Sequence, residues 1–338
     1  MCLLIRRSIE TARAAAIEYE HLVRTGSALR RATGGAIAAP TALVGTRRCL
    51  ITSLCDASPL SKLARDAAAS DSKGEERASG PVGTRRASAL AQVDASARPA
   101  HAGAAETDAG RVAPAPSPPQ LSPLAAHAVR RSVRDLYDAY GQMVLCSDTF
   151  HADPHPGNLL VPHNIRRAAA LAAARQLVPP PLRWCLPEAP PRLYLIDWGQ
   201  CGGPTPIERR RQIARLYVAL ASAGDAHFES QPAVARRVAS ALDDLGVLMT
   251  TKAGRDSAVE KAELARGMFD LTGEIELHAG VEFDNGSIDA LPKDLFLVLR
   301  VTQMLSGLGH AAEKAGSAKV GRLAHAWRRH AKRALADA

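Results

Sequence analysis

The stretch His151-Ala152-Asp153-Pro154-His155-Pro156-Gly157-Asn158, followed later by Asp197-Trp198-Gly199, decides the fold of this 338-residue chain. The first segment has the form H-x-D-x-x-x-x-N and the second has the form D-x-G. Between them lie two short apolar runs, Leu159-Leu160-Val161 and Leu193-Tyr194-Leu195-Ile196, which are rich in strand formers. By itself, the first segment could be an ordinary turn that matches the motif by chance, because His, Asp, Pro, Gly and Asn are all common in turns. Two such motifs flanking two strands are poorly explained by chance.

The spacing of both motifs is that of a phosphoryl-transfer site of the protein-kinase type. In that chemistry one aspartate orients the attacking hydroxyl group, which makes Asp153 the candidate catalytic residue. An asparagine and a second aspartate hold Mg²⁺ against the nucleotide phosphates, and Asn158 and Asp197 occupy those positions. The sequence therefore predicts a kinase-like fold with ATP and Mg²⁺ as cofactors.

A zinc site is the first alternative, because His151 and His155 have the spacing of a metal pair on a helix. Pro154, Pro156 and Gly157 argue against a helix there, since two prolines and a glycine cannot continue the hydrogen-bond ladder. A loop is therefore the better interpretation of this segment.

The run from Leu136 to Val161 resembles the core of the UbiB/ADCK (aarF-domain) atypical kinase family. The hallmark of that family is a phenylalanine, here Phe150, followed by HADPHPGN and later by a D-F-G element. Trp198 replaces the usual phenylalanine of that element, which is a conservative aromatic change. The resemblance extends from about His127 to the C-terminus, and its motifs are strong only between Phe150 and Gly199.

This resemblance implies an atypical kinase or ATPase linked to ubiquinone or other prenyl-lipid metabolism in mitochondria or plastids. It implies the roles given above for Asp153, Asn158 and Asp197, with His151 as the structural histidine of the loop. It also implies prenyl-lipid biosynthesis proteins or a membrane surface as partners besides the nucleotide. Aminoglycoside and choline phosphotransferases are the nearest rivals, because their loops are similar and often carry an I-D-W sequence like the one that begins at Ile196.

Composition limits the classes of function that remain. The formal net charge is +9, but the arginines are spread through alanine-rich segments without interleaved aromatic residues, so nucleic acid is not expected as a partner. The six cysteines form no C-x-x-C pair, which is typical of isolated thiols in a reducing compartment. No run of 18 uncharged apolar residues occurs, so no transmembrane segment is expected.

The N-terminal part is expected to divide at about residue 25. Residues 1–25 are predicted to contain one helix, from Ser8 to Val23. Residues 26–123 form a low-complexity region, transit-like near its start and a disordered linker from Asp66 onward, where large apolar side chains are nearly absent. Three early glutamates argue against an import signal, so the organelle stays an open question.

Residues 124–338 are predicted to form the helical C-lobe of an α+β, protein-kinase-like fold, behind the disordered N-terminal region. A helix should precede the catalytic loop, and an insertion of about 162–191 should separate the two strands. Thr205-Pro206-Ile207-Glu208 predicts a capping box with proline at the first helical position. Three apolar stripes then predict buried helix faces: Ile213, Leu216, Tyr217 and Leu220; Val234, Val238, Leu242 and Leu245, closed by Gly246; and Leu295, Val298, Leu299, Thr302 and Leu305.

A recognisable kinase N-lobe is missing. Upstream of His151 there are only two lysines, Lys62 and Lys73, and neither lies in a strand context such as V-A-I-K. No G-x-G-x-x-G loop occurs either. We therefore expect an incomplete or weakly active kinase, with a catalytically dead nucleotide-binding or scaffold module as the alternative.

Overall fold

The computed structural model describes residues 3–7, 14–47, 49–62, 123–163, 174, 177–179, 190–203, 205–251, 257–271, 286–314 and 316–337. Its contacts divide the chain into two units, one of Met1–Ala64 with Gln120–Ala338 and one of Arg65–Pro119. All described residues belong to the first unit. The predicted linker after Asp66 and most of the predicted insertion at 162–191 lie outside them.

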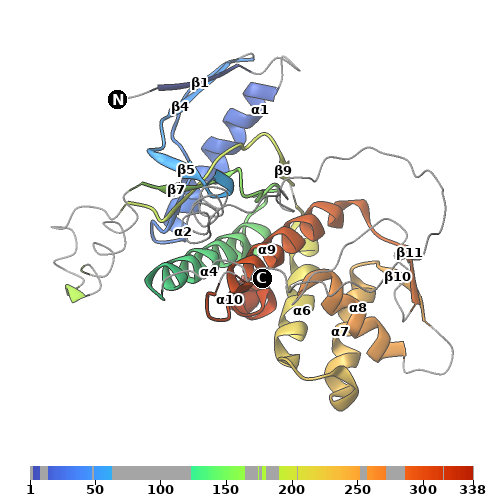
Figure 1. Cartoon of the computed structure of the whole chain (residues 1–338). Coiled ribbons are helices and arrows are strands. Elements are labelled where there is room, and N and C mark those ends of the chain that lie inside the picture. Colours follow the sequence, from blue (N-terminus) through green and yellow to red (C-terminus); the bar gives the residue numbers. More distant parts are fainter. Residues whose placement is uncertain are drawn as a thin grey trace, which may run out of the picture. The chain divides into compact units, whose positions relative to one another are not determined.

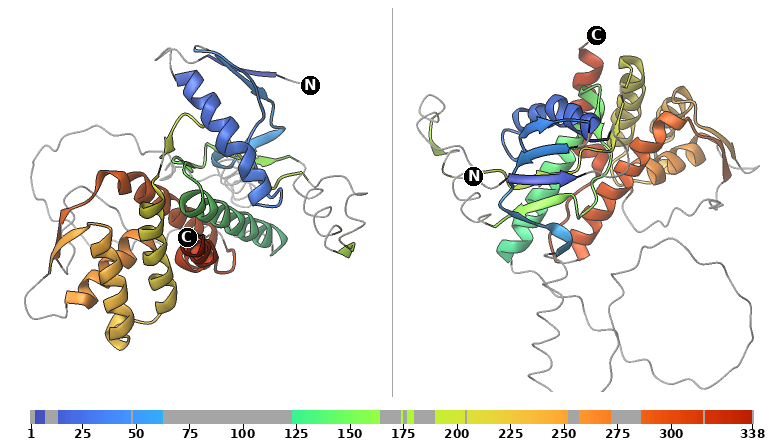
Figure 2. Two further views of the ribbon diagram at one scale, coloured as in Figure 1. Left: turned by 180° about the vertical axis from the view of Figure 1, so that it is seen from behind. Right: turned by 90° about the horizontal axis from the view of Figure 1, so that it is seen from above.

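A long helix, α4 (Pro123–Cys146), lies at the centre of the helical part. It packs against α6 (Ile207–Ala223), α9 (Phe296–Lys314) and α10 (Leu323–Ala336), as Figures 1 and 2 show. Its buried face follows the helical period that the sequence predicted before the catalytic loop. Arg131 and Arg134 lie on the opposite, exposed face of α4, so the apolar face is the one that packs into the core.

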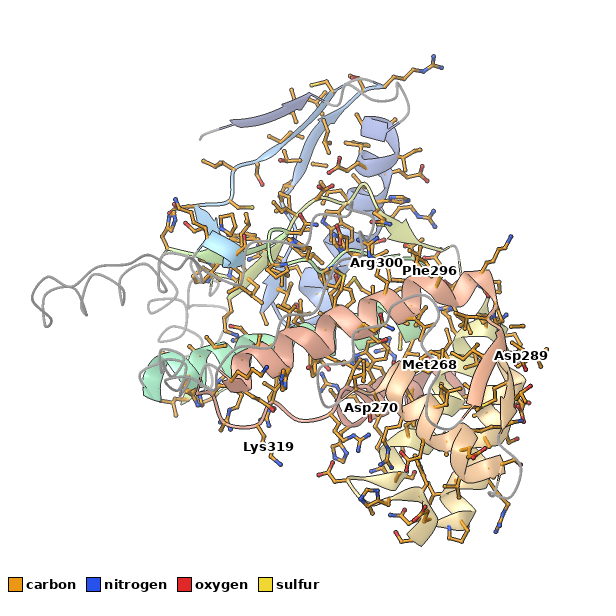
Figure 3. The ribbon with its side chains drawn as sticks, turned by 45° about the vertical axis from the view of Figure 1, so that its right-hand side comes forward. Met268, Asp270, Asp289, Phe296, Arg300 and Lys319 are labelled. Atoms are coloured by element: carbon orange, nitrogen blue, oxygen red, sulfur yellow. The ribbon has the colours of Figure 1, made fainter. Side chains whose placement is uncertain are left out.

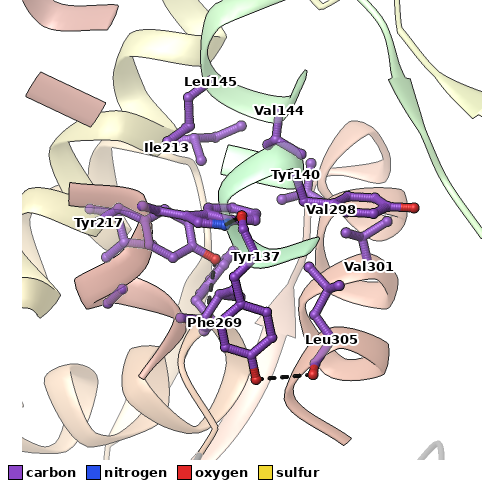
Figure 4. Close-up of a cluster of buried hydrophobic side chains, with 14 of the residues drawn as sticks. Tyr137, Tyr140, Val144, Leu145, Ile213, Tyr217, Phe269, Val298, Val301 and Leu305 are labelled. Carbon is purple, nitrogen blue, oxygen red and sulfur yellow. Dashed lines mark hydrogen bonds between the residues drawn. The ribbon is translucent and has the colours of Figure 1, made fainter. Parts of the chain in front are cut away.

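Aromatic side chains join these helices in one core (Figure 4). The rings of Tyr217 on α6 and Trp327 on α10 lie 4.5 Å apart, and the Tyr217 hydroxyl donates to the Phe269 carbonyl at 3.0 Å. Tyr137 on α4 donates to the Leu305 carbonyl on α9 at 3.1 Å. An aromatic pair of this kind contributes about 0.5–1.5 kcal/mol beyond its buried area.

The three predicted apolar stripes are confirmed as buried helix faces. The first stripe lies on α6 and the third mainly on α9. The second lies on α7 (Pro232–Asp244), and Gly246, with a φ of +77°, follows the end of that helix. α8 (Ser257–Phe269) and the short 3-10 helices η3 (Phe228–Ser230) and η4 (Lys293–Leu295) complete the region. β10 (Leu248–Thr251) pairs antiparallel with β11 (Gly286–Ala290) beside them.

The predicted capping box at the start of α6 is not formed. α6 begins at Ile207, Pro206 is the N-cap residue with ψ 147°, and no side chain caps the helix. The Thr205 amide donates to the Asp148 carbonyl at 2.6 Å, so Thr205 is anchored to the preceding loop. Glu208 instead forms ion pairs with two arginines of the same helix, Arg211 and Arg215.

Two strands predicted around the catalytic loop form the centre of a four-stranded sheet. β7 (Leu159–Pro162) pairs antiparallel with β8 (Leu193–Leu195), which confirms that pair. β2 (Ile37–Ala38) runs parallel to β8, and β5 (Ala57–Pro59) runs antiparallel to β7. Strands from the N-terminal part thus border the catalytic strands.

Residues 26–62 were expected to form a low-complexity region without regular structure, but they form α2 (Ser27–Ala32) and the strands β2 to β5. β1 (Leu3–Arg7), β4 (Cys49–Ser53) and β3 (Ala42–Gly45) form an antiparallel sheet in the order β1-β4-β3. Leu50 and Thr52 are buried while their neighbours in β4 are half-exposed, which is the alternation of a one-sided strand. Such short strands give little signal in an alanine- and arginine-rich background.

The predicted N-terminal helix corresponds to α1 (Ala14–His21), while residues 8–13 lie outside the described part. α1 continues through a π-helix, η1 (Leu22–Gly26), into α2 (Ser27–Ala32). A π-helical turn is rare in proteins and often marks a functional site.

The segment Lys293–Lys314 is the one helix in the described ranges that is long and apolar enough to cross a membrane, and half of its apolar window is buried inside the fold. The expected absence of a transmembrane segment therefore stays a prediction.

Candidate functional site

The fold brings both sequence motifs together. β6 (Phe150–His151) pairs antiparallel with β9 (Cys201–Gly202). The catalytic loop begins on β6 and the D-W-G segment leads into β9, so this pair places the two motifs side by side. The Ala152 amide donates to the Gln200 carbonyl at 3.0 Å, and the Ile196 amide donates to the Asn158 carbonyl at 3.0 Å. These two bonds fix the loop of Asp153 and Asn158 against the loop of Asp197.

His151 is fully buried and binds both loops. Its Nε2 lies 2.9 Å from the Asp197 carbonyl oxygen and 3.1 Å from that of Ile196, so Nε2 must carry the hydrogen. Nδ1 is then the acceptor, and the Tyr140 hydroxyl donates to it across 2.9 Å. Burial lowers the pKa of His151 and raises that of Tyr140 well above its ordinary value, so the ring stays neutral and the hydroxyl stays protonated.

These contacts also argue against the zinc alternative. Both ring nitrogens of His151 are occupied by hydrogen bonds, while the Nδ1 atom of His155 accepts from the Gly157 amide at 3.0 Å. The segment is a turn and not a helix, as its prolines predicted. Within the described ranges, no group of three or more His, Cys, Asp or Glu residues is arranged to hold a metal ion.

Asp197 is the only non-glycine residue in the described part of the chain with a positive φ, at 62°. A left-handed backbone at such a residue costs about 1–3 kcal/mol and persists only where neighbours enforce it. The hydrogen bond from His151 to the Asp197 carbonyl oxygen is one such constraint. Two further constraints are hydrogen bonds made by the backbone of the next residue, Trp198.

Trp198 is held by α1. Its amide donates to Glu18 Oε1 at 3.2 Å, and its carbonyl oxygen accepts from His21 Nδ1 at 3.1 Å. The buried indole donates from Nε1 to the Leu195 carbonyl at 3.0 Å and meets the His151 ring edge-on, with centroids 5.0 Å apart. The conformation of Asp197 is therefore set jointly by α4, the catalytic loop and α1.

Asp153 is the centre of a polar cluster. Its Oδ1 accepts from Arg300 of α9 at 2.9 Å, and its Oδ2 accepts from the Asn158 side-chain amide at 3.2 Å. Arg300, labelled on α9 in Figure 3, also donates to Gln200 Oε1 at 2.9 Å, so one guanidinium binds both loops. A carboxylate has about four lone-pair positions, so these bonds leave Asp153 able to accept from a further hydroxyl group.

The residues predicted as magnesium ligands have suitable chemistry. The Asn158 amide nitrogen donates to the Asp153 backbone and side chain, which leaves the amide oxygen as a potential ligand. With the Asp197 carboxylate, that atom supplies the hard oxygen ligands that Mg²⁺ prefers. Thiol chemistry is disfavoured nearby, because burial raises the pKa of Cys201 to about 12.

Several contributors to the site were not predicted from the sequence. Tyr140, Glu18 and His21 reach the motifs from α4 and α1, and no local pattern distinguishes them from ordinary helix residues. Arg300 reaches Asp153 from α9, and this contact was not predicted from the sequence either.

Comparison with known proteins supports the kinase interpretation. Residues 123–228 match the family model described as the ABC1 atypical kinase-like domain, which is less than half of the chain. No curated protein matches the sequence. The matched segment contains α4, the catalytic loop, the D-W-G segment and α6. Residues 123–228 thus carry an ABC1 atypical kinase-like domain.

Proposed function

We propose that this chain is a UbiB/ADCK-like atypical kinase or ATPase that binds a magnesium nucleotide. Asp153 is the catalytic residue, and Asn158 and Asp197 hold the metal. The observation that carries the proposal is the pair of backbone hydrogen bonds, at 3.0 Å each, that fixes the Asp153–Asn158 loop against the Asp197 loop. Such fixed oxygen ligands suit phosphoryl transfer, where catalysis is mainly positioning and electrostatics.

Each residue has a separate task in this proposal. Asp153 orients the attacking hydroxyl group or water, and Arg300 holds its carboxylate in place from α9. Asn158 and Asp197 offer oxygen atoms to the magnesium ion that neutralises the nucleotide phosphates when it is bound. His151 positions Asp197 through the carbonyl bond and takes no part in proton transfer, because both of its nitrogens are engaged.

We further propose that turnover is low. In a kinase, a lysine on a strand and a phosphate-covering loop position the nucleotide from the N-lobe. None of the five described N-terminal strands, β1 to β5, contains a lysine. Losing one preorganised donor commonly lowers a rate by about a hundredfold or more. The antiparallel sheet β1-β4-β3 with α1 supplies only a reduced counterpart of that lobe.

The same absence of a strand lysine from β1 to β5 favours a second candidate, a nucleotide-binding or scaffold module without catalysis. The Ile196-Asp197-Trp198 sequence favours a third, an aminoglycoside- or choline-type phosphotransferase. The link to ubiquinone or prenyl-lipid metabolism, the partners and a mitochondrial or plastid location rest on the family resemblance alone.

Calorimetric titration of the full chain with ATP and Mg²⁺, followed by a phosphate-release assay, tests these candidates. The proposal expects binding that requires Mg²⁺ and slow ATP turnover that Asp153→Asn removes. Binding without turnover supports the scaffold, and rapid transfer to free alcohols supports the small-molecule phosphotransferase. No heat at millimolar ATP would refute nucleotide use altogether.

A further inference from the structure

A second candidate binding site lies on the side of α4 that faces α2 and α10. There the structure contains a cavity of about 630 Å³, which is within the range of small-molecule sites. Its polar lining comes from four elements: Thr25 from η1, Arg31 from α2, Gln142 of α4 with Ser147 directly after that helix, and Arg329, His330 and Arg333 from α10. None of these residues belongs to the phosphoryl-transfer motifs.

The charge of this cavity is unbalanced. Arg329 forms an ion pair with Asp138, and His330 Nε2 lies 2.7 Å from the same carboxylate. Among the residues that the structure describes, Arg333 pairs with Asp337 alone, at 3.7 Å, and both side chains are more than half exposed. The Arg31 carbonyl oxygen accepts from the Gly34 amide at 3.3 Å, but its guanidinium forms no ion pair or hydrogen bond with any residue that the structure describes. Three guanidinium groups therefore face the space with two carboxylates to neutralise them, so the cavity favours an anion.

We propose that this cavity binds a small phosphate-bearing molecule. Guanidinium groups recognise phosphate through two parallel hydrogen bonds, and they are less strongly hydrated than ammonium groups. Arg31 and Arg333 approach the space from different helices, so a tetrahedral group with several oxygens can bind both. The Ser147 hydroxyl donates to the Gln142 carbonyl across a long 3.5 Å and adds a further donor for the ligand.

Occupancy of this site acts on the D-W-G segment through α1. Thr25 in the cavity wall is hydrogen-bonded to Thr149 at 2.6 Å, directly before the strand that carries His151. The π-helix η1 joins the cavity helix α2 to α1, whose Glu18 and His21 hold the backbone of Trp198. A ligand that bridges α2 and α10 thus braces α1 and stabilises the conformation of Asp197. This consequence extends the proposed function, but the binding itself is independent of it.

Titration of the full chain with inorganic pyrophosphate in the presence of EDTA tests the site. Omitting Mg²⁺ and nucleotide separates the result from the catalytic proposal. We expect millimolar or tighter binding, weakened about tenfold by Arg31→Gln or Arg333→Gln, since each substitution removes a charge-assisted hydrogen bond to the phosphate. Arg328→Gln is the matched control, because Arg328 is an exposed arginine of α10 outside the cavity lining.

Four results would overturn the assignment: no binding, equal binding by the Arg31→Gln/Arg333→Gln double variant, an equal loss in Arg328→Gln, or equally tight binding of citrate. Circular dichroism confirms that the variants fold. Sedimentation with phosphatidic acid vesicles separates the sources of the phosphate. Arginine-dependent co-sedimentation identifies a lipid headgroup, and pyrophosphate binding without it identifies a free compound.

Hydrogen exchange tests the connection to the D-W-G segment. Pyrophosphate should raise the protection of the Trp198 amide in the parent chain and not in the double variant. Saturated binding that leaves this amide unchanged would refute the coupling through α1.

Discussion

Removing the Tyr140 hydroxyl with Tyr140→Phe should loosen the D-W-G segment without creating a cavity. The hydroxyl is fully buried and donates to His151 Nδ1 at 2.9 Å, and the Asp153 amide, at 3.3 Å, is the other donor to that nitrogen. With one long bond remaining, His151 holds the Asp197 carbonyl oxygen less firmly. The left-handed backbone of Asp197 then loses part of its support.

The magnitude follows from the burial of both partners. A buried hydrogen bond contributes about 0.5–1.5 kcal/mol, and a buried acceptor left poorly satisfied costs about 1–3 kcal/mol. Because the Asp153 amide compensates in part, we expect a loss of about 1–2 kcal/mol in the free energy of unfolding. At about 2–4 °C per kcal/mol for a domain of this size, the melting temperature should fall by about 2–8 °C.

Tyr137→Phe is the matched control, since Tyr137 lies one turn earlier on α4 and is also buried. Its hydroxyl donates to the Leu305 carbonyl at 3.1 Å, in the helical core. Urea unfolding should show similar losses for both variants. Hydrogen exchange should show reduced protection of residues 196–200 only in Tyr140→Phe. Equal loosening of that segment in both variants, or none in Tyr140→Phe, would refute the role given to the Tyr140–His151 bond.

Three further predictions concern the same region. Because burial lowers the pKa of His151, the unfolded chain binds more protons below pH 6.5, so stability should fall as pH drops below that value; urea midpoints at pH 5.5 and 7.5 should differ less in His151→Gln than in the parent chain. Asp153→Asn and Asp197→Asn should retain the circular dichroism spectrum and lose magnesium-nucleotide turnover, and full turnover in either variant would show that its assigned role is wrong. Replacing residues 164–189 within the predicted insertion of about 162–191 with an Asn-Gly turn, which leaves Pro162 of β7 in place, should maintain or raise the melting temperature, because a shorter loop costs less closure entropy; a large decrease would show that the segment packs.

The parts of the fold predicted from the sequence are those with strong local patterns. α4, the pair β7–β8 and the buried faces of α6, α7 and α9 follow from apolar periodicity within single segments. α10 was missed because its buried face consists largely of alanines around Trp327, which gives a weak apolar stripe. The capping box was wrong because the Thr205 amide is bound to the Asp148 carbonyl instead of helping to cap the helix.

The candidate site shows a similar division. Asp153, Asn158 and Asp197 could be proposed as site residues because their spacing lies within two short motifs. The contacts that fix them join residues far apart in the chain, such as Glu18 with Trp198 and Arg300 with Asp153. No periodicity or spacing within one segment encodes such pairs. The N-terminal sheet was not predicted for a related reason: β1 pairs with β4, and α1 and α2 lie between these two strands in the sequence.

Binding of Mn²⁺ in place of Mg²⁺ tests the central claim most directly. Electron paramagnetic resonance of the full chain with ATP should show protein-bound Mn²⁺, with affinity reduced about tenfold or more by Asp197→Asn. Asp294→Asn is the control, because that exposed carboxylate pairs with Arg209 away from both motifs. Equal Mn²⁺ binding by the parent chain and Asp197→Asn, or none by either, would contradict the account.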